Sequence, residues 1–165
     1  MQRITLVTIV TVSLVILAAV FLTAAAPAAP RWPAASLDYW EQVRPNLAII
    51  ETQSKTAMSA VGKPDATQTI SDAVTAVTSA ASAIAKIEPP TALLPLAIQI
   101  DYTGETCLSA IKYASSVKLD NIGAAVSVPV FTQFGIECRN AIHAAHMEAA
   151  RYASTVGGFP VNAEN

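Results

Sequence analysis

Residues 65–90 read DATQTISDAVTAVTSAASAIAKIEPP, and this stretch decides the fold class. Its apolar residues recur every three or four positions, which is the spacing of one face of an α-helix; they include Ile70, Val74, Val77, Ala81 and Ile84. Asp65 with Gln68 three residues later predicts a capping box at the start of this helix. Pro89-Pro90 ends it, because two prolines remove two backbone donors and disfavour helical backbone in the residue before them.

The segment before this stretch repeats the helical spacing. Its apolar positions run from Trp40 to Val61, and Ser36 stands ahead of them as the expected N-cap of a first helix. Pro45 lies inside the run, which predicts either a kink or a later start of regular helix. Gly62-Lys63-Pro64 ends the helix.

Two more helices are expected after the Pro-Pro pair. The third covers residues 91–118, where Pro95 falls in the first turn and is tolerated there. The start of the fourth has two solutions: it begins near Asp120 and kinks, or it begins afresh at Ser127 with Pro129 in its first turn. Helices of roughly 20 to 27 residues joined by short turns predict an all-α, antiparallel up-down four-helix bundle. This bundle covers residues 36–158 and is followed by a short tail, 159–165.

The N-terminus carries a membrane signal. Residues 4–22 contain no charge, and a helix over them would cover roughly 28 Å, close to the hydrocarbon thickness of a bilayer. We therefore expect a hydrophobic membrane helix within residues 1–26, retained as a signal-anchor. Two alternatives stay open, a buried core helix and a cleaved signal peptide, although cleavage after Ala26 would place Pro27 next to the scissile bond.

Residues 27–35 are rich in proline and alanine and predict an extended spacer between the membrane helix and the bundle. Trp32 within it either rests in the lipid headgroup layer or packs on the folded domain. A weak excess of positive charge before the apolar segment places the bundle outside the cytoplasm. The expected location is the cell membrane, in a single pass, or the periplasm or exterior after cleavage.

Charge and composition exclude some classes of function. The chain has 165 residues with 53% hydrophobic residues and a formal net charge of -2. It is too apolar to be disordered along its length. It also lacks the positive excess that binding a nucleic-acid backbone needs. We expect no nucleic-acid partner.

Cys107 and Cys138 are the two cysteines of the chain, and both fall on predicted core faces. An even number of inward-facing cysteines predicts a disulfide in an oxidising compartment. If the fourth helix restarts near Val128, the two cysteines lie equally far from the turn between the third and fourth helices, and so at the same height in the bundle. If that helix starts at Asp120, the cysteines are offset by about 10 Å along the helix axis and cannot form a bond. The disulfide is therefore predicted together with a helix break before Pro129. The alternative is two independent buried thiols.

Few residues suggest chemistry. No nucleotide, redox, zinc-protease or esterase motif is present. His143 and His146 are neighbours on one helix and are candidate metal ligands. At 100° per residue His143 lies near 140° from the core direction and faces solvent or a rim, so we predict no metal site.

The run Arg139-Asn140-Ala141-Ile142-His143, with the Pro-Pro linker, resembles the periplasmic four-helix b-type cytochromes, in which such a histidine ligates haem. The resemblance implies His143 as a cofactor-binding candidate. It covers five residues and a linker, and this chain has Trp40 where those proteins have a methionine ligand, with no methionine between it and Met58. We predict no cofactor and keep haem or small-ligand binding as the alternative function.

The sequence favours a membrane-tethered or secreted extracytoplasmic bundle with a structural or protein-interaction role and no enzymatic activity. The barely charged outer face of residues 71–80 is either solvated or a docking surface for a protein partner or a second copy.

Overall fold

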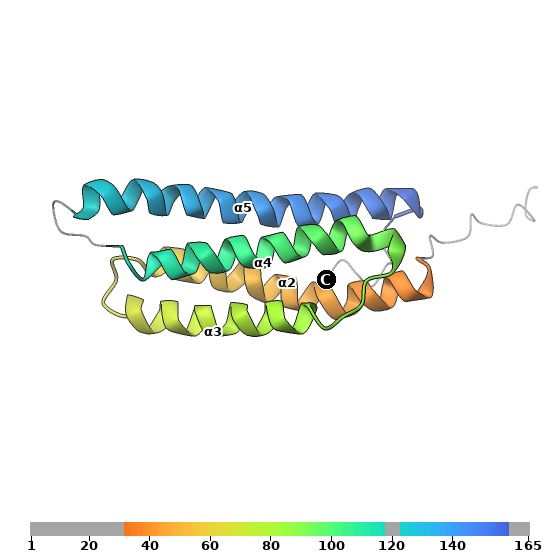
Figure 1. Ribbon diagram of the computed structural model, residues 1–165, viewed down its shortest axis with the longest axis horizontal. Coiled ribbons are helices and arrows are strands. Elements are labelled where there is room, and N and C mark those ends of the chain that lie inside the picture. Colours follow the sequence, from red (N-terminus) through yellow and green to blue (C-terminus); the bar gives the residue numbers. More distant parts are fainter. Residues whose placement is uncertain (1–31, 118–122, 159–165) are drawn as a thin grey trace, which may run out of the picture. The chain divides into compact units, whose positions relative to one another are not determined.

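The computed structural model describes residues 32–117 and 123–158, and this part of the chain is all-helical (Figure 1). Its four α-helices are α2 (Ala34–Ala60), α3 (Ala66–Ile84), α4 (Leu94–Ala114) and α5 (Gly123–Thr155), and a 3-10 turn, η1 (Thr91–Leu93), precedes α4. No strand occurs among these residues, so the predicted all-α class is confirmed. The helices lie side by side, as expected of a helical bundle.

The predicted membrane helix, residues 1–26, and the tail, 159–165, lie outside the described residues. Within the described ranges, no helix combines the length and the apolar character that crossing a bilayer requires. The predicted spacer boundary at residue 36 falls inside α2, because helical backbone already begins at Ala34.

The periodicity selected the larger aliphatic residues of the core, but in α3 it also chose Val74 and Ala81, which are half-buried, in place of the buried Ala73 and Ala80. Helices α2, α3 and α4 contribute fully buried aliphatic side chains to the core, among them Val43, Leu47, Ile50, Val77, Ile100 and Ile111. Small residues bring α3 and α4 close together, since a Cβ added at Gly104 would lie 3.4 Å from the Cβ of Ala81. This distance is at the near limit of ordinary van der Waals contact, so the seam has no room for larger side chains.

The helix ends differ from the sequence prediction in their capping. Ser36 is not the N-cap of α2: the helix starts after Pro33, and Ser36 is buried one turn inside it. Asp65 precedes α3 but makes no side-chain cap hydrogen bond, and Gln68 Nε2 donates instead to Asp72 Oδ1 at 2.7 Å. The predicted capping box is therefore wrong, because Gln68 finds a carboxylate one turn ahead.

Proline positions were predicted with mixed success. Pro45 does not delay α2, which is helical on both sides of it. Pro95 lies in the first turn of α4, as expected. Pro129 lies inside α5, whose described part starts at Gly123, which agrees with the predicted start near Asp120 and not with a fresh start at Ser127. Gly62 adopts φ 84° two residues after Ala60, the last residue of α2, which confirms the expected end of the first helix.

Cys107 on α4 and Cys138 on α5 form a disulfide, with their Cα atoms 4.6 Å apart. The predicted pairing of the two cysteines is confirmed. The helix break before Pro129 that was predicted together with it is wrong, since α5 has no break there. Cys107 lies seven residues before the end of α4, whereas Cys138 lies fifteen after the start of α5. The N-terminal end of α5 therefore extends about 12 Å beyond α4 (Figure 1). The prediction assumed that α4 and α5 end at the same level where the chain connects them. The connecting segment, residues 115–122, has eight residues and is long enough to join helix ends at different levels.

Removing the disulfide should destabilise the domain. A Cys107→Ser/Cys138→Ser variant frees a loop of 31 residues, which the chain-entropy model values at about 3 to 4 kcal/mol. We expect a Tm roughly 10 to 20 °C lower by circular dichroism of the full chain in mild detergent. Wild-type protein treated with reductant is the control and should show the same loss. An unchanged Tm in both would contradict a structural disulfide.

Tyr39, at the contact between α2 and α4, should make the stability of the domain depend on pH in the alkaline range. Its burial, and secondarily the charge of Asp101, raise its pKa to about 12. Because the folded-state pKa is raised, the contribution of Tyr39 to stability is complete below the unfolded pKa of about 10 and is lost as the pH rises toward 12. The wild type should lose more stability than Tyr39→Phe between pH 10 and pH 12, measured by denaturant unfolding. Tyr102→Phe, at a side chain 56% exposed, is the control and should match the wild type.

Candidate functional site

Helices α2 and α5 are held together at one end. Trp32 Nε1 donates to the carbonyl of Gly158 at 2.8 Å, and the Tyr152 hydroxyl donates to Ser36 Oγ at 2.8 Å. The rings of Trp32 and Tyr152 meet edge to face with centroids 4.9 Å apart. Trp32 is buried, so of the two predicted roles the structure shows packing on the folded domain. The start of α2 is thus fastened to the end of α5.

Away from this end, α2 and α5 separate. Of the neighbouring helix pairs they make the fewest contacts, whereas α4 packs closely on α5 and α2 on α3. A groove with a volume of about 710 Å³ lies between them. Its lining comes from both helices: Glu51, Ser54, Lys55, Met58 and Ser59 of α2, and Phe131, Thr132, Gly135, Cys138, Arg139, Ile142, His143 and His146 of α5.

The inner lining of the groove is mainly apolar. Met58, Phe131 and Ile142 contribute hydrophobic side chains, and the disulfide reaches the lining through Cys138. Gly135 leaves space between them, because an added Cβ would meet only Met58 Sδ, at 3.7 Å. The buried hydroxyl of Ser54 donates to the carbonyl of Ile50 at 2.6 Å and is therefore already satisfied within α2.

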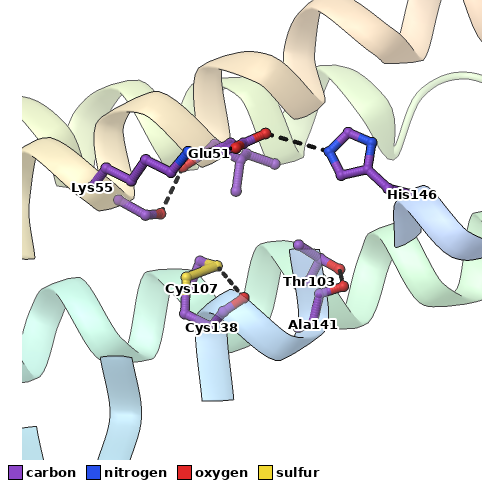
Figure 2. A network of polar contacts seen from close by, with 9 residues as sticks. Glu51, Lys55, Thr103, Cys107, Cys138, Ala141 and His146 are labelled. Carbon is purple, nitrogen blue, oxygen red and sulfur yellow. Dashed lines mark hydrogen bonds and ion pairs between the residues drawn. A yellow bond between two sulfur atoms is a disulfide. The ribbon is translucent and has the colours of Figure 1, made fainter. Parts of the chain in front are cut away.

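Glu51 bridges the two helices at the edge of the groove. Figure 2 shows its carboxylate between the Lys55 ammonium, at 2.6 Å, and His146 Nε2, at 3.3 Å. The hydrogen bond from Lys55 lowers the pKa of Glu51, with a smaller contribution from His146, against the opposing effect of partial burial. The contact with His146 becomes an ion pair when the imidazole is protonated.

The opposite side of the groove, on α5, carries a guanidinium and an imidazole. Arg139 and His143 are exposed on α5, and neither has a carboxylate partner among the residues that the structure describes. Lys55 extends from α2 with 73% of its side chain exposed. The edge of the groove therefore holds two permanent positive charges, Lys55 and Arg139, against the single carboxylate of Glu51.

Contacts behind the groove fix α5 on α4. The Thr103 hydroxyl lies 2.7 Å from the carbonyl of Gln99 and 3.0 Å from that of Ala141, and its single proton serves one at a time. The disulfide lies one turn further along (Figure 2). The sulfur of Cys107 also approaches the carbonyl of Cys138 at 3.6 Å, but a disulfide sulfur has no proton to donate. These contacts determine which residues of α5 face α2.

His143 lies where helical geometry predicted. His143 is exposed at the rim, and His146 is exposed and hydrogen-bonded to Glu51. Within residues 32–117 and 123–158 no group of three His, Cys, Asp or Glu side chains is arranged to hold a metal ion.

The structure separates the residues that the cytochrome resemblance brings together. Trp40 packs on Trp32 with ring centroids 6.2 Å apart, and Trp32 in turn contacts Tyr152. Tyr152 lies nine residues, or about 14 Å, along α5 from His143. Met58 lies opposite Gly135, which is eight residues, or about 12 Å, from His143 in the other direction. Neither Trp40 nor Met58 therefore occupies a position from which, with His143, it would complete an axial ligand pair.

The sequence analysis missed the groove, because it placed residues on each helix separately. Gly135 was the available signal, since a glycine between Phe131 and Cys138 on the inner face leaves a gap. Arg139, one residue after Cys138, was a second signal. Comparisons with protein-family models, with curated proteins and with solved structures gave no match to this chain.

Glu51→Gln should remove a pH-dependent part of the stability. Because the folded-state pKa of Glu51 is lowered, its contribution is present above the unfolded pKa of about 4.3 and is lost as the pH falls through the folded value. At pH 7 we expect the variant to be less stable by about 0.2 to 1 kcal/mol, as for exposed pairs. Denaturant unfolding at pH 7 and at progressively lower pH measures this, and the difference between the variant and the wild type should shrink as the pH falls. A difference that stays constant with pH would show that Glu51 acts by packing alone.

Proposed function

We propose that this protein is an extracytoplasmic binding protein, and that the groove between α2 and α5 is its ligand site. In this proposal an antiparallel up-down four-helix bundle follows a membrane helix at residues 4–26, retained as a signal-anchor or cleaved. The groove is the observation that carries the proposal. Its volume of about 710 Å³ lies within the range of roughly 300 to 1,000 Å³ typical of small-molecule sites. The sequence favoured a structural or protein-interaction role and kept small-ligand binding as the alternative; the groove supports the alternative.

Two features support a location outside the cytoplasm. The disulfide between Cys107 and Cys138 belongs to a class of bond that persists in oxidising compartments and is rare in the cytosol. The uncharged segment at residues 4–22 has the length and composition of an export or anchor sequence. The predicted cell-membrane location, with the bundle outside, is therefore part of the proposal.

The polar groups of the groove favour binding over turnover. A hydroxyl nucleophile needs a base within hydrogen-bond reach. Among the described residues, the groove hydroxyls of Ser54, Ser59 and Thr132 instead donate to the backbone of their own helix. The proposal therefore includes no reaction.

A protein-interaction role is the second candidate, and one surface favours it. Leu94, Ile98 and Tyr102 follow one another at four-residue intervals on α4 and are 44%, 69% and 56% exposed. Such a row forms a stripe on one helix face. The outer face of α3, which the sequence suggested as a docking surface, carries none of the exposed large apolar residues of the described chain. A partner or a second copy of this chain would therefore dock on α4.

The methionines offer a direct test of the groove. Met58 lines it, whereas Met147 is 56% exposed on α5 outside it. The full chain, with ¹³C-labelled methionine methyls and held in phosphatidylcholine nanodiscs, would be titrated with the neutral apolar probe 1-aminoanthracene. We expect a saturable shift of the Met58 methyl signal and no shift of the Met147 signal.

A filling variant supplies the control. Gly135→Leu places a side chain in the groove without a backbone clash and should abolish the Met58 shift. Ala150→Leu, at an exposed position of the same helix, adds the same bulk outside the groove and should leave the shift intact. Equal responses of Met58 and Met147, or a Met58 response that survives Gly135→Leu, would refute the proposed site.

A further inference from the structure

We propose that the ligand of the α2–α5 groove is a long-chain fatty acid, bound with its carboxylate at Lys55 and Arg139 and its chain along Met58 toward Phe131. This inference rests on the proposed function, because it names the class of ligand for the same groove. Its basis is the combination of an apolar interior with a cationic edge on two different helices.

The charges at the edge match a single negative charge. Lys55 and Arg139 lie on opposite banks, and Glu51 is the one carboxylate among the lining residues. Lys55, Arg139 and Glu51 together give the edge a net charge of one positive unit. The whole chain has a formal net charge of -2, so this local excess is not a consequence of a generally basic protein. A monoanionic carboxylate complements this edge better than a neutral or a doubly charged head group.

Arg139 is the group best suited to receive the carboxylate. Its guanidinium presents a planar fork that binds a carboxylate through two parallel hydrogen bonds. No carboxylate of the described residues competes for it, whereas Lys55 is shared with Glu51 at 2.6 Å. Arg139 would therefore provide specificity, and Lys55 would add charge from the facing helix.

The shape of the groove suits one extended acyl chain. From Arg139 the lining on α5 runs past Gly135 to Phe131, which is eight residues, or roughly 12 Å, along the helix axis. A longer acyl chain would extend beyond Phe131. Met58 covers the middle of this path from α2, opposite the gap at Gly135. The chain would leave the cationic edge near Arg139 and lie over this gap.

The other apolar occupants fit the charges less well. The chain's own segment at residues 4–22 has no charged residue and would leave Arg139 without a partner. A second copy of the protein would have to bring a carboxylate together with an apolar segment into the groove. The stripe at Leu94, Ile98 and Tyr102 has exposed Asp101 and Glu105 beside it, so this occupant is one of the outcomes of the test. The charge pattern favours the fatty acid over the uncharged segment 4–22.

The test compares hexadecanoate with hexadecanol, which has the same chain and no charge. Both are titrated into the full chain in phosphatidylcholine nanodiscs, with the methyl signal of Met58 as the readout and that of Met147 as the reference. We expect hexadecanoate to bind at least tenfold more tightly than hexadecanol. Arg139→Gln should weaken hexadecanoate about tenfold and leave hexadecanol unchanged.

Two further variants sharpen the result. Arg151→Gln removes an arginine of the same helix that lies outside the groove and pairs with Glu148, so it should not change hexadecanoate binding. Glu51→Gln raises the net charge of the edge and should tighten hexadecanoate binding several-fold.

The outcomes separate this inference from the proposed function. If acid and alcohol bind equally, Arg139→Gln has no effect and Gly135→Leu blocks both, the fatty-acid inference falls and the groove remains a ligand site. If neither compound moves the Met58 signal, both proposals fall. A Met58 signal that shifts with protein concentration alone, or photo-cross-links from the groove to residues 4–22, would overturn the inference in favour of a second copy or the N-terminal segment.

Discussion

The bond between Cys107 and Cys138 fixes the position of α5 along α4, and the rest of the candidate site depends on this register. With Cys138 held beside Cys107, Ala141 accepts from Thr103, and Phe134 packs on Tyr113 with ring centroids 5.1 Å apart. The same register lets α5 extend past the end of α4 at one end of the bundle. At the other it brings Tyr152 to Ser36.

Because α5 is fastened to α4, it cannot also close fully on α2. The contacts at Trp32 and Tyr152 join the two helices at one end, and Glu51 bridges them to His146 further along. Beyond that point the small side chain of Gly135 leaves a gap. The groove is thus a product of three local facts: a fixed α4–α5 register, a single tied end, and a glycine on the facing surface. An apolar space of this kind is filled by a ligand more favourably than by water.

The sequence predicted the features that a single helix determines. Residue periodicity located the helices and the core positions such as Ile50, Val77 and Ile100, and Gly62 marked the first turn. It also placed His143 on the exposed side of its helix. The pairing of the cysteines was predicted correctly. The prediction assumed, however, that α4 and α5 end at the same level, whereas α5 extends beyond the end of α4. What escaped prediction depends on the placement of one helix against another: the role of Ser36 as a partner of Tyr152, the bridge from Glu51 to His146, and the groove itself. Helical spacing gives the direction of each side chain, but not the distance to the next helix.

The groove between α2 and α5 is proposed to hold a small ligand with an apolar chain. Native mass spectrometry of the full chain, purified from its native source without added lipid, is the most direct test. We expect a wild-type chain carrying one additional mass of fatty-acid size, which is absent from Gly135→Leu purified in parallel. A wild-type chain that carries no such mass, or a mass retained by the Gly135→Leu variant, would contradict this proposal.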